Sequence, residues 1–211
     1  MAAYTDHEEL EKLKEWWKNY GTALLVGVVL GLGLLFGNKY WTRYQEDQRA
    51  AASALYAQMF KQTQAAKADQ ARTTGKKLID EYGRTPYAGM AALMLARLSV
   101  EANDPAAART HLQWAIDHAT DAATIHAARL RLGQLHLANR EFDAALALVR
   151  EDAPGFEGEY SELKGDAYVG LGKPEDARAA YSAALKDLSG KAQARALVEM
   201  KLADIAGIKS K

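Results

Sequence analysis

Apolar and polar residues follow two different patterns along the chain. Residues 19–38 contain no charged side chain and read NYGTALLVGVVLGLGLLFGN. Beyond Lys39, apolar residues recur at helical spacing among many Ala, Leu, Glu, Lys and Arg residues, and runs of alternating β-branched residues are almost absent. The pattern predicts an all-α fold in which one long apolar helix near the start is followed by shorter helices.

The apolar run has the length and the flanks of a transmembrane helix. Its twenty residues, at a rise of about 1.5 Å each, span the roughly 30 Å of a hydrocarbon core. Aromatic rings, which favour the headgroup level, stand at both ends: Trp16, Trp17, Tyr20, Tyr40, Trp41 and Tyr44. These flanks disfavour a buried core helix, and a cleaved signal peptide would need a basic leader and small residues soon after the run. We predict a leader over 1–18, a single uncleaved transmembrane helix over 19–38 and a juxtamembrane segment over 39–49.

Charge does not decide how this helix is oriented. Three basic residues lie on each side of it, Lys12, Lys14 and Lys18 before it and Lys39, Arg43 and Arg49 after it, and the positive-inside rule therefore leaves the orientation open. Over the whole chain, 27 basic and 27 acidic residues cancel, which argues against nucleic acid as a partner. The absence of cysteine is compatible with an oxidising or a reducing compartment.

The clearest repeat lies between Ser161 and Leu185. Its small and aromatic residues stand at the spacing of a tetratricopeptide repeat, in which two antiparallel helices pack closely: Gly165, Tyr168, Gly172, Ala177, Tyr181 and Ala184. Alignment on Ala177 finds equivalents at Ala144, Ala108 and Ala71, with spacings of 33, 36 and 37 residues against a usual period of about 34. We expect degenerate tetratricopeptide-like repeats, an α-solenoid, over 50–190, followed over 191–211 by a capping helix and a tail.

No residue pattern indicates catalysis. The segment 170–173 resembles a phosphate-binding loop, but it lacks the upstream glycine and the Ser or Thr after the lysine that such a loop needs. The five histidines show no short metal-ligand spacing, and no nucleophile motif is present. We predict a protein that is not an enzyme, that uses no cofactor or metal, and whose partner is another protein.

The repeat register predicts a groove for that partner. In this repeat class the first helix of each pair lines a concave surface, and the register assigns to it Tyr56, Phe60, Met90, Leu93, Arg97, His126, Arg129, His136, Glu159, Glu162 and Asp166. The groove would be apolar near the membrane, basic in its middle and acidic at its far end, which suits a segment with apolar anchors and charges that fix its direction. The alternative is that these residues form ordinary solvated helix faces, with the apolar ones belonging to the core.

Two pairs of glycines in the apolar run have the spacing that lets membrane helices approach closely, Gly27 with Gly31 and Gly33 with Gly37. At about 100° per residue the two pairs point in different directions. Either two different neighbouring helices pack there, or the glycines reflect only how common this residue is in membrane helices.

Several of these features together resemble a known family. The acidic leader, the segment GTALLVGVVLGLGLLFGNKYW, the helix with Ser53-Ala54-Leu55-Tyr56 and the degenerate repeats are similar to those of the YfgM family, whose members are ancillary subunits of the bacterial SecYEG translocon. The resemblance covers essentially the whole chain. It implies a bacterial inner-membrane protein with a cytoplasmic N-terminus and a periplasmic repeat domain. It also implies two partners, the SecYEG translocon and a membrane-anchored chaperone of the parvulin type, PpiD.

We therefore expect a scaffold, anchored in membrane lipid beside the translocon, that links unfolded exported proteins to periplasmic chaperones by protein–protein binding. The residues alone leave two other functions open. One is a regulator that sequesters a signalling protein, and the other is a structural subunit of an envelope assembly.

Overall fold

Helices make up all the regular structure in the described part of the chain. The computed structural model describes residues 3–188 and 190–206, and no β-strand occurs among them. The helices are α1 (Ala3–Gln64), α2 (Ala68–Tyr82), α3 (Pro86–Glu101), α4 (Pro105–His118), α5 (Ala122–Ala138), α6 (Phe142–Ala147), α7 (Glu157–Gly170), α8 (Pro174–Asp187) and α9 (Ala192–Ala206). The predicted all-α fold is confirmed. Residues 207–211, the last part of the capping helix and tail predicted over 191–211, lie outside the described residues.

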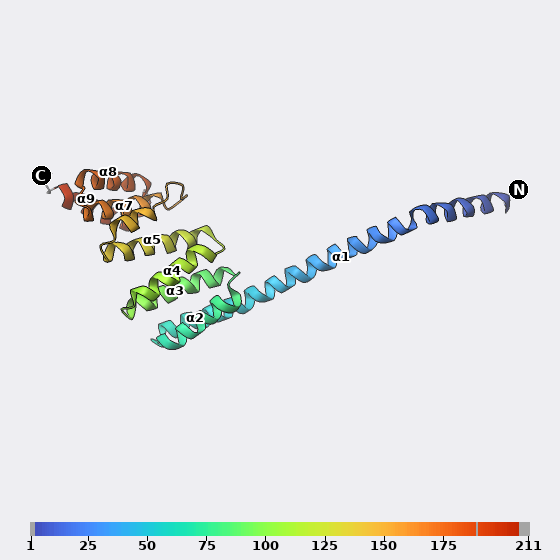
Figure 1. Ribbon diagram of the computed structural model, residues 1–211, viewed down its shortest axis with the longest axis horizontal. Helices are drawn as coiled ribbons and strands as arrows, with labels where there is room; N and C mark the ends of the chain where they lie inside the picture. Colours follow the sequence, from blue (N-terminus) through green and yellow to red (C-terminus); the bar gives the residue numbers. More distant parts are fainter. Residues whose placement is uncertain (1–2, 189, 207–211) are drawn as a thin grey trace. The chain divides into compact units, whose positions relative to one another are not determined.

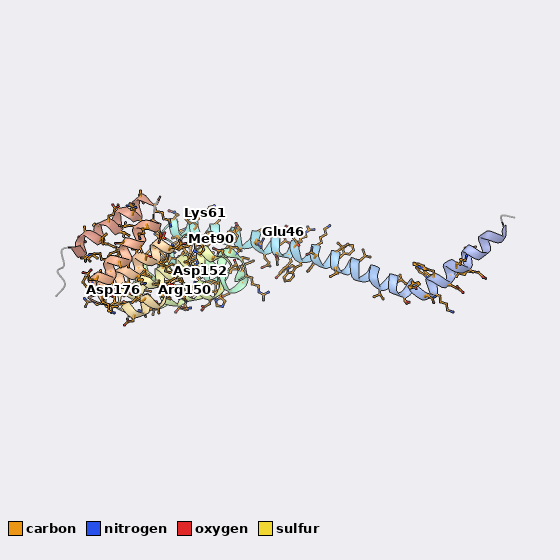
Figure 2. All side chains as sticks on the ribbon, turned by 90° about the horizontal axis from the view of Figure 1, so that it is seen from above. Glu46, Lys61, Met90, Arg150, Asp152 and Asp176 are labelled. Carbon is orange, nitrogen blue, oxygen red and sulfur yellow. The ribbon has the colours of Figure 1, made fainter. Side chains whose placement is uncertain are left out.

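The chain divides into two compact units, Met1–Gln48 and Arg49–Lys211, here called the anchor unit and the repeat unit. In the anchor unit, one helix, α1, contains residues 3–18 of the predicted leader, the predicted span and residues 39–48 of the juxtamembrane segment. Its described side chains are almost all exposed, and Figure 2 shows them, around the labelled Glu46, projecting outward from the helix. By length and composition, one helix in the described part of the chain can cross a membrane, and none of its apolar window is buried.

Aromatic residues stand on both sides of the apolar run in the anchor unit. The ring centroids of Trp16 and Tyr20 lie 5.9 Å apart, and those of Trp41 and Tyr44 lie 6.1 Å apart. All four side chains are exposed. Each end of the run therefore carries a pair of rings that can sit at the level of lipid headgroups.

The repeat unit is a stack of helical hairpins. The part of α1 that begins at Arg49 packs with α2, and α3 packs with α4, α5 with α6, and α7 with α8, while α9 packs on α8 as the last helix of the described chain. Figure 1 shows α2, α3, α4 and α5 following one another along this stack, with α7, α8 and α9 grouped at its end. The arrangement confirms the predicted tetratricopeptide-like solenoid.

The same turn joins the two helices of each hairpin. One residue of each turn has a positive φ, namely Ala66 (55°), Asn103 (58°), Arg140 (61°) and Gly172 (69°). The next amide donates to the carbonyl five residues earlier, from Lys67 to Gln62, Asp104 to Ser99, Glu141 to His136 and Lys173 to Tyr168. These bonds satisfy carbonyls left open at a helix end. The last of the four turns has glycine, the residue that adopts this φ most easily, which is why the sequence reveals that turn most clearly.

The turns correct the register predicted for the third hairpin. The four left-handed residues are separated by 37, 37 and 32 residues. The same spacings separate four fully buried alanines in the second helices, Ala71, Ala108, Ala145 and Ala177. Sequence alignment placed the third of these at Ala144, which is only half-buried. Because two alanines are adjacent here, the alignment was displaced by one residue, and the packing selects Ala145.

Close packing joins the last hairpin to α9. A Cβ atom at Gly165 of α7 would overlap the ring of Tyr181, which confirms that this glycine lets the two helices approach. The buried Tyr181 hydroxyl donates to Asp166 Oδ1 at 2.7 Å. Leu188, just after α8, and Val198 of α9 are both fully buried in the same cluster. The first two contacts hold α7 and α8 together, and the apolar cluster of Leu188 and Val198 fixes α9 against the end of the hairpin.

Candidate functional site

An open cavity of about 420 Å³ lies between the end of α1 and α3. Its apolar wall is formed by Tyr56 and Phe60 from α1 and by Met90, Leu93 and Met94 from α3. All of these except Met94 were predicted for the groove. Phe60 follows Tyr56 by four residues, and Leu93 and Met94 follow Met90 by three and four, so that each set lies on one side of its helix. Phe60 and Met90, the latter labelled in Figure 2, are exposed despite being large and apolar. The cavity therefore presents apolar surface to solvent.

A second cavity of about 560 Å³ continues the first and extends from α3 to α5. Its apolar wall is formed by Leu93, Ala96, Val100, Leu112, Leu135 and Ala138. Leu93, Arg97 and Arg131 line both cavities. The two cavities thus form one continuous depression, here called the apolar groove.

Two arginines stand where the cavities meet. Arg97 donates from Nε to Glu101 Oε1 at 2.7 Å on its own helix, which balances its charge locally. Arg131 of α5 is exposed, and it takes part in none of the ion pairs found among the described residues. Burial raises the pKa of the Tyr56 hydroxyl, and the charge of Arg131 partly offsets that rise. The groove therefore carries an unbalanced positive charge between two apolar walls.

The acidic residues predicted for the far end of the groove have partners within the chain. Lys201 of α9 donates to Glu162 Oε1 at 2.6 Å and to Asp166 Oδ2 at 2.8 Å. Burial alone would lower the pKa of Lys201, but hydrogen bonds and charge from Asp166 and Glu162 raise it above its ordinary value. Lys191 forms an ion pair with Glu159. The chain's own C-terminal segment therefore neutralises this end.

His126 and Arg129, predicted for the middle of the groove, lie outside both cavities. The His126 ring stacks on Phe156 with centroids 5.0 Å apart, and its Nδ1 lies 3.0 Å from the Tyr160 hydroxyl oxygen. Burial, and after it the charge of Arg129, lowers the pKa of His126. The two residues thus belong to the contact between α5 and the start of α7.

His136 also lies outside the apolar groove. Its Nδ1 pairs with Glu141, the residue before α6, and Arg109 of α4 binds the other oxygen of the same carboxylate at 2.6 Å. The hydrogen bond from Arg109, and then that from His136, lowers the pKa of Glu141. His136 therefore serves a contact between neighbouring hairpins.

The predicted groove left out the repeat position that Arg131 occupies. Measured back from the left-handed residue of each turn, Arg131 and Gln134 occupy the positions of Met94 and Arg97 in the preceding hairpin. Met94 was not among the predicted groove residues, and its counterpart Arg131 was therefore passed over. The one-residue displacement, about 100° of helix rotation, placed Arg129 at the position of Leu93, which Leu130 holds in the observed register. Asp104 and Glu141, acidic residues that directly precede the second helices, are the signal that aligns the two hairpins correctly.

The glycine pairs of the anchor unit are open on the surface of α1. A Cβ atom added at Gly27, Gly31, Gly33 or Gly37 would meet nothing within 4 Å. No described part of the chain packs against them, and their role in helix contact stays a prediction. Among the described residues, no three His, Asp or Glu side chains are grouped in a way that could hold a metal ion.

Comparison with known proteins identifies the family. A family model described as a tetratricopeptide repeat-like domain matches residues 14–207. A relative from Neisseria gonorrhoeae is 30% identical over 208 residues, which cover 96% of this chain and 98% of the relative. A relative from Haemophilus influenzae is 29% identical over 199 residues, 93% of this chain and 96% of the relative.

A third relative, from Escherichia coli, is 29% identical over 182 residues, 86% of this chain and 87% of the relative. All three are named as ancillary SecYEG translocon subunits. No solved structure matches the chain significantly. The match covers the helical repeats, the anchor helix and nearly the whole length of the chain. The chain therefore belongs to the family of ancillary SecYEG translocon subunits.

Proposed function

We propose that the chain is a scaffold of the bacterial inner membrane that associates with the SecYEG translocon and binds polypeptide segments in its apolar groove. The observation that carries the proposal is the match, over 96% of the chain, to a relative named as an ancillary SecYEG translocon subunit. The matched length includes the apolar helix as well as the repeats. Anchor and repeat unit therefore belong to one function.

The partners of the groove are unfolded exported proteins and a parvulin-type chaperone such as PpiD. Both offer exposed polypeptide segments, and the groove offers exposed apolar surface with a positive charge. Binding would need no bond to be made or broken. The scaffold would act by holding an emerging chain and a chaperone near the translocon at the same time, which raises their effective concentration.

Co-purification tests this proposal. The full chain would carry an affinity tag, be expressed in the bacterium, and be purified after mild crosslinking in membranes. We expect SecY and PpiD to be recovered and detected by immunoblot. Recovery of neither protein would contradict the proposal, and recovery of a response regulator in their place would favour the regulator function.

The glycine pairs supply a test of how the anchor takes part. If Gly31 contacts a translocon helix, Gly31→Leu should reduce the recovered SecY because the added side chain prevents close approach. Leu25→Ile, at an exposed position on a different face of the same helix, is the control and should leave recovery unchanged. Equal recovery from both variants would show that Gly31 is not at the contact.

The proposed orientation has a cytoplasmic N-terminus and a periplasmic repeat unit. Alkaline phosphatase fused after Lys211 becomes active only outside the cytoplasm, because its disulfides form there. We expect the fusion to be active. The orientation would be overturned if the phosphatase fusion were inactive and a green fluorescent protein fused at the same position were fluorescent.

A further inference from the structure

We propose that the apolar groove recognises a peptide segment in which an acidic residue stands between large apolar residues, with the carboxylate bound by Arg131. This inference deepens the proposed function and rests on its claim that the groove binds polypeptide. It adds the chemistry of the bound segment and names the side chain that selects it.

Exposed apolar side chains mark where the segment would lie. Among the described residues of the repeat unit, the exposed large hydrophobic ones are Phe60, Met90, Val100, Val169, Leu197 and Met200. The first three line the groove, with Phe60 and Met90 in the cavity beside α1 and Val100 in the cavity beside α5. Contiguous exposed apolar surface marks interaction sites on soluble proteins, and methionine adapts to different bound shapes. Each cavity can therefore accept an apolar side chain.

Arg131 lies between these two apolar subsites because it lines both cavities. Its planar guanidinium can donate two parallel hydrogen bonds to one carboxylate. Arg97 stands beside it but is already paired with Glu101. A ligand that fills both cavities would thus bring its middle residue to Arg131, and an acidic residue there would balance the charge.

The other end of the repeat unit does not favour a basic ligand. Glu162 and Asp166 are the acids that would attract one, and Lys201 already binds both at 2.6 Å and 2.8 Å. A basic ligand would have to displace this lysine together with part of α9. Charge complementarity in the open part of the groove therefore selects an acidic segment.

Peptide binding to the full chain in lipid nanodiscs tests the inference. The probe is a short fluorescein-labelled peptide with a glutamate at its centre. On each side of the glutamate, serine separates it from a pair of leucines. Matched peptides replace the glutamate by glutamine or lysine, or replace the leucines by serine. Fluorescence anisotropy gives Kd for each peptide with the unchanged protein, with Arg131→Glu, and with Arg84→Glu. Arg84 is an exposed arginine in the turn after α2, outside the groove, and serves as the control for net charge.

We expect the glutamate peptide to bind about fivefold more tightly than the glutamine peptide, the gain of a partly exposed ion pair. Arg131→Glu should weaken binding of the glutamate peptide about tenfold and strengthen binding of the lysine peptide. Arg84→Glu should leave the order of affinities unchanged. Circular dichroism should show the same helix content for all three proteins.

Two results would overturn the inference. One is equal binding of the glutamate, glutamine and lysine peptides, which would leave an apolar groove without charge selection. The other is an unchanged preference in Arg131→Glu. Neither result alters the recovery of SecY with the tagged chain, which separates failure of this inference from failure of the proposed translocon association.

Discussion

The two ends of the repeat unit use equivalent positions in opposite ways. Phe60, Arg97 and Asp166 each stand six residues before the left-handed residue of their turn. Phe60 and Arg97 line an open groove, whereas Asp166 is bound by Lys201 from the helix that follows. The same repeat can therefore display a side chain to a ligand or use it to hold the end of the stack.

The burial of apolar side chains also differs between the two ends of the repeat unit. Leu188 is fully buried between the last hairpin and α9, while Phe60 remains 48% exposed in the groove. A solenoid needs a cover for its last apolar surface, and α9 provides it. The groove leaves apolar surface exposed to solvent, which lowers the stability of the free protein. A partner that covers this surface would offset that loss.

The largest expected effect comes from truncating an apolar side chain at the covered end. Leu188→Ala should lower the free energy of unfolding by about 3 kcal/mol, because it removes a fully buried side chain and leaves a cavity. Phe60→Ala, its counterpart in the groove, should change it by less than about 1 kcal/mol. Urea unfolding followed by circular dichroism in micelles measures both. Equal losses would show that the groove is part of the core.

A smaller effect is expected from the ion pairs that hold α9. Lys201→Met leaves Glu162 and Asp166 without their cation and should lower the free energy of unfolding by about 1.5 kcal/mol. Hydrogen exchange should become faster mainly in α9. Lys186→Met is the control, since Lys186 is an exposed cation of α8 that enters no ion pair within the described ranges. If exchange accelerates equally in every hairpin, α9 is not held by this contact.

The smallest expected effect is a pH dependence of stability that comes from Glu141, which lies between the two ends of the repeat unit. Hydrogen bonds from Arg109 and His136 hold the pKa of Glu141 below its ordinary value of 4.5. A lowered pKa in the folded state gives stability that is present above that ordinary value and is lost as pH falls through the lower one.

The urea midpoint should therefore fall on acidification below about pH 4.5, and Glu141→Gln should remove part of that fall. Asp143→Asn, which changes an exposed carboxylate on α6, should remove less of it. A Glu141→Gln variant with the same acid dependence as the unchanged protein would contradict the proposed contribution.

Much of the fold could be predicted from the sequence because its signals are local. An uncharged run with aromatic flanks predicts the anchor helix, and Gly165, Gly172 and Ala177 predict the last hairpin. The third hairpin was harder, because the adjacent Ala144 and Ala145 allow two registers. That ambiguity placed Arg129 at the repeat position that Leu130 holds, and Arg131 was missed because its repeat position, that of Met94, was not among those predicted for the groove.

The partners of the acidic residues could not be predicted in the same way. Glu162 and Lys201 are separated by 39 residues, and no spacing rule connects them. Their contact follows from how α9 packs on α8, which is a tertiary effect. The apolar residues of the cavity beside α1 could be predicted because Tyr56 and Phe60 follow the helical period in one helix, and Met90 and Leu93 follow it in another.

Site-specific photocrosslinking in living bacteria tests most directly whether the open groove is where partners bind. A photoreactive amino acid would replace Met90 in the groove or Val169, an exposed residue of α7 near the covered end. We predict crosslinks to PpiD or to exported chains from position 90, which Arg131→Glu weakens, and few from position 169. Crosslinks of equal strength from both positions, or crosslinks at position 90 that Arg131→Glu leaves unchanged, would contradict the groove as the binding site.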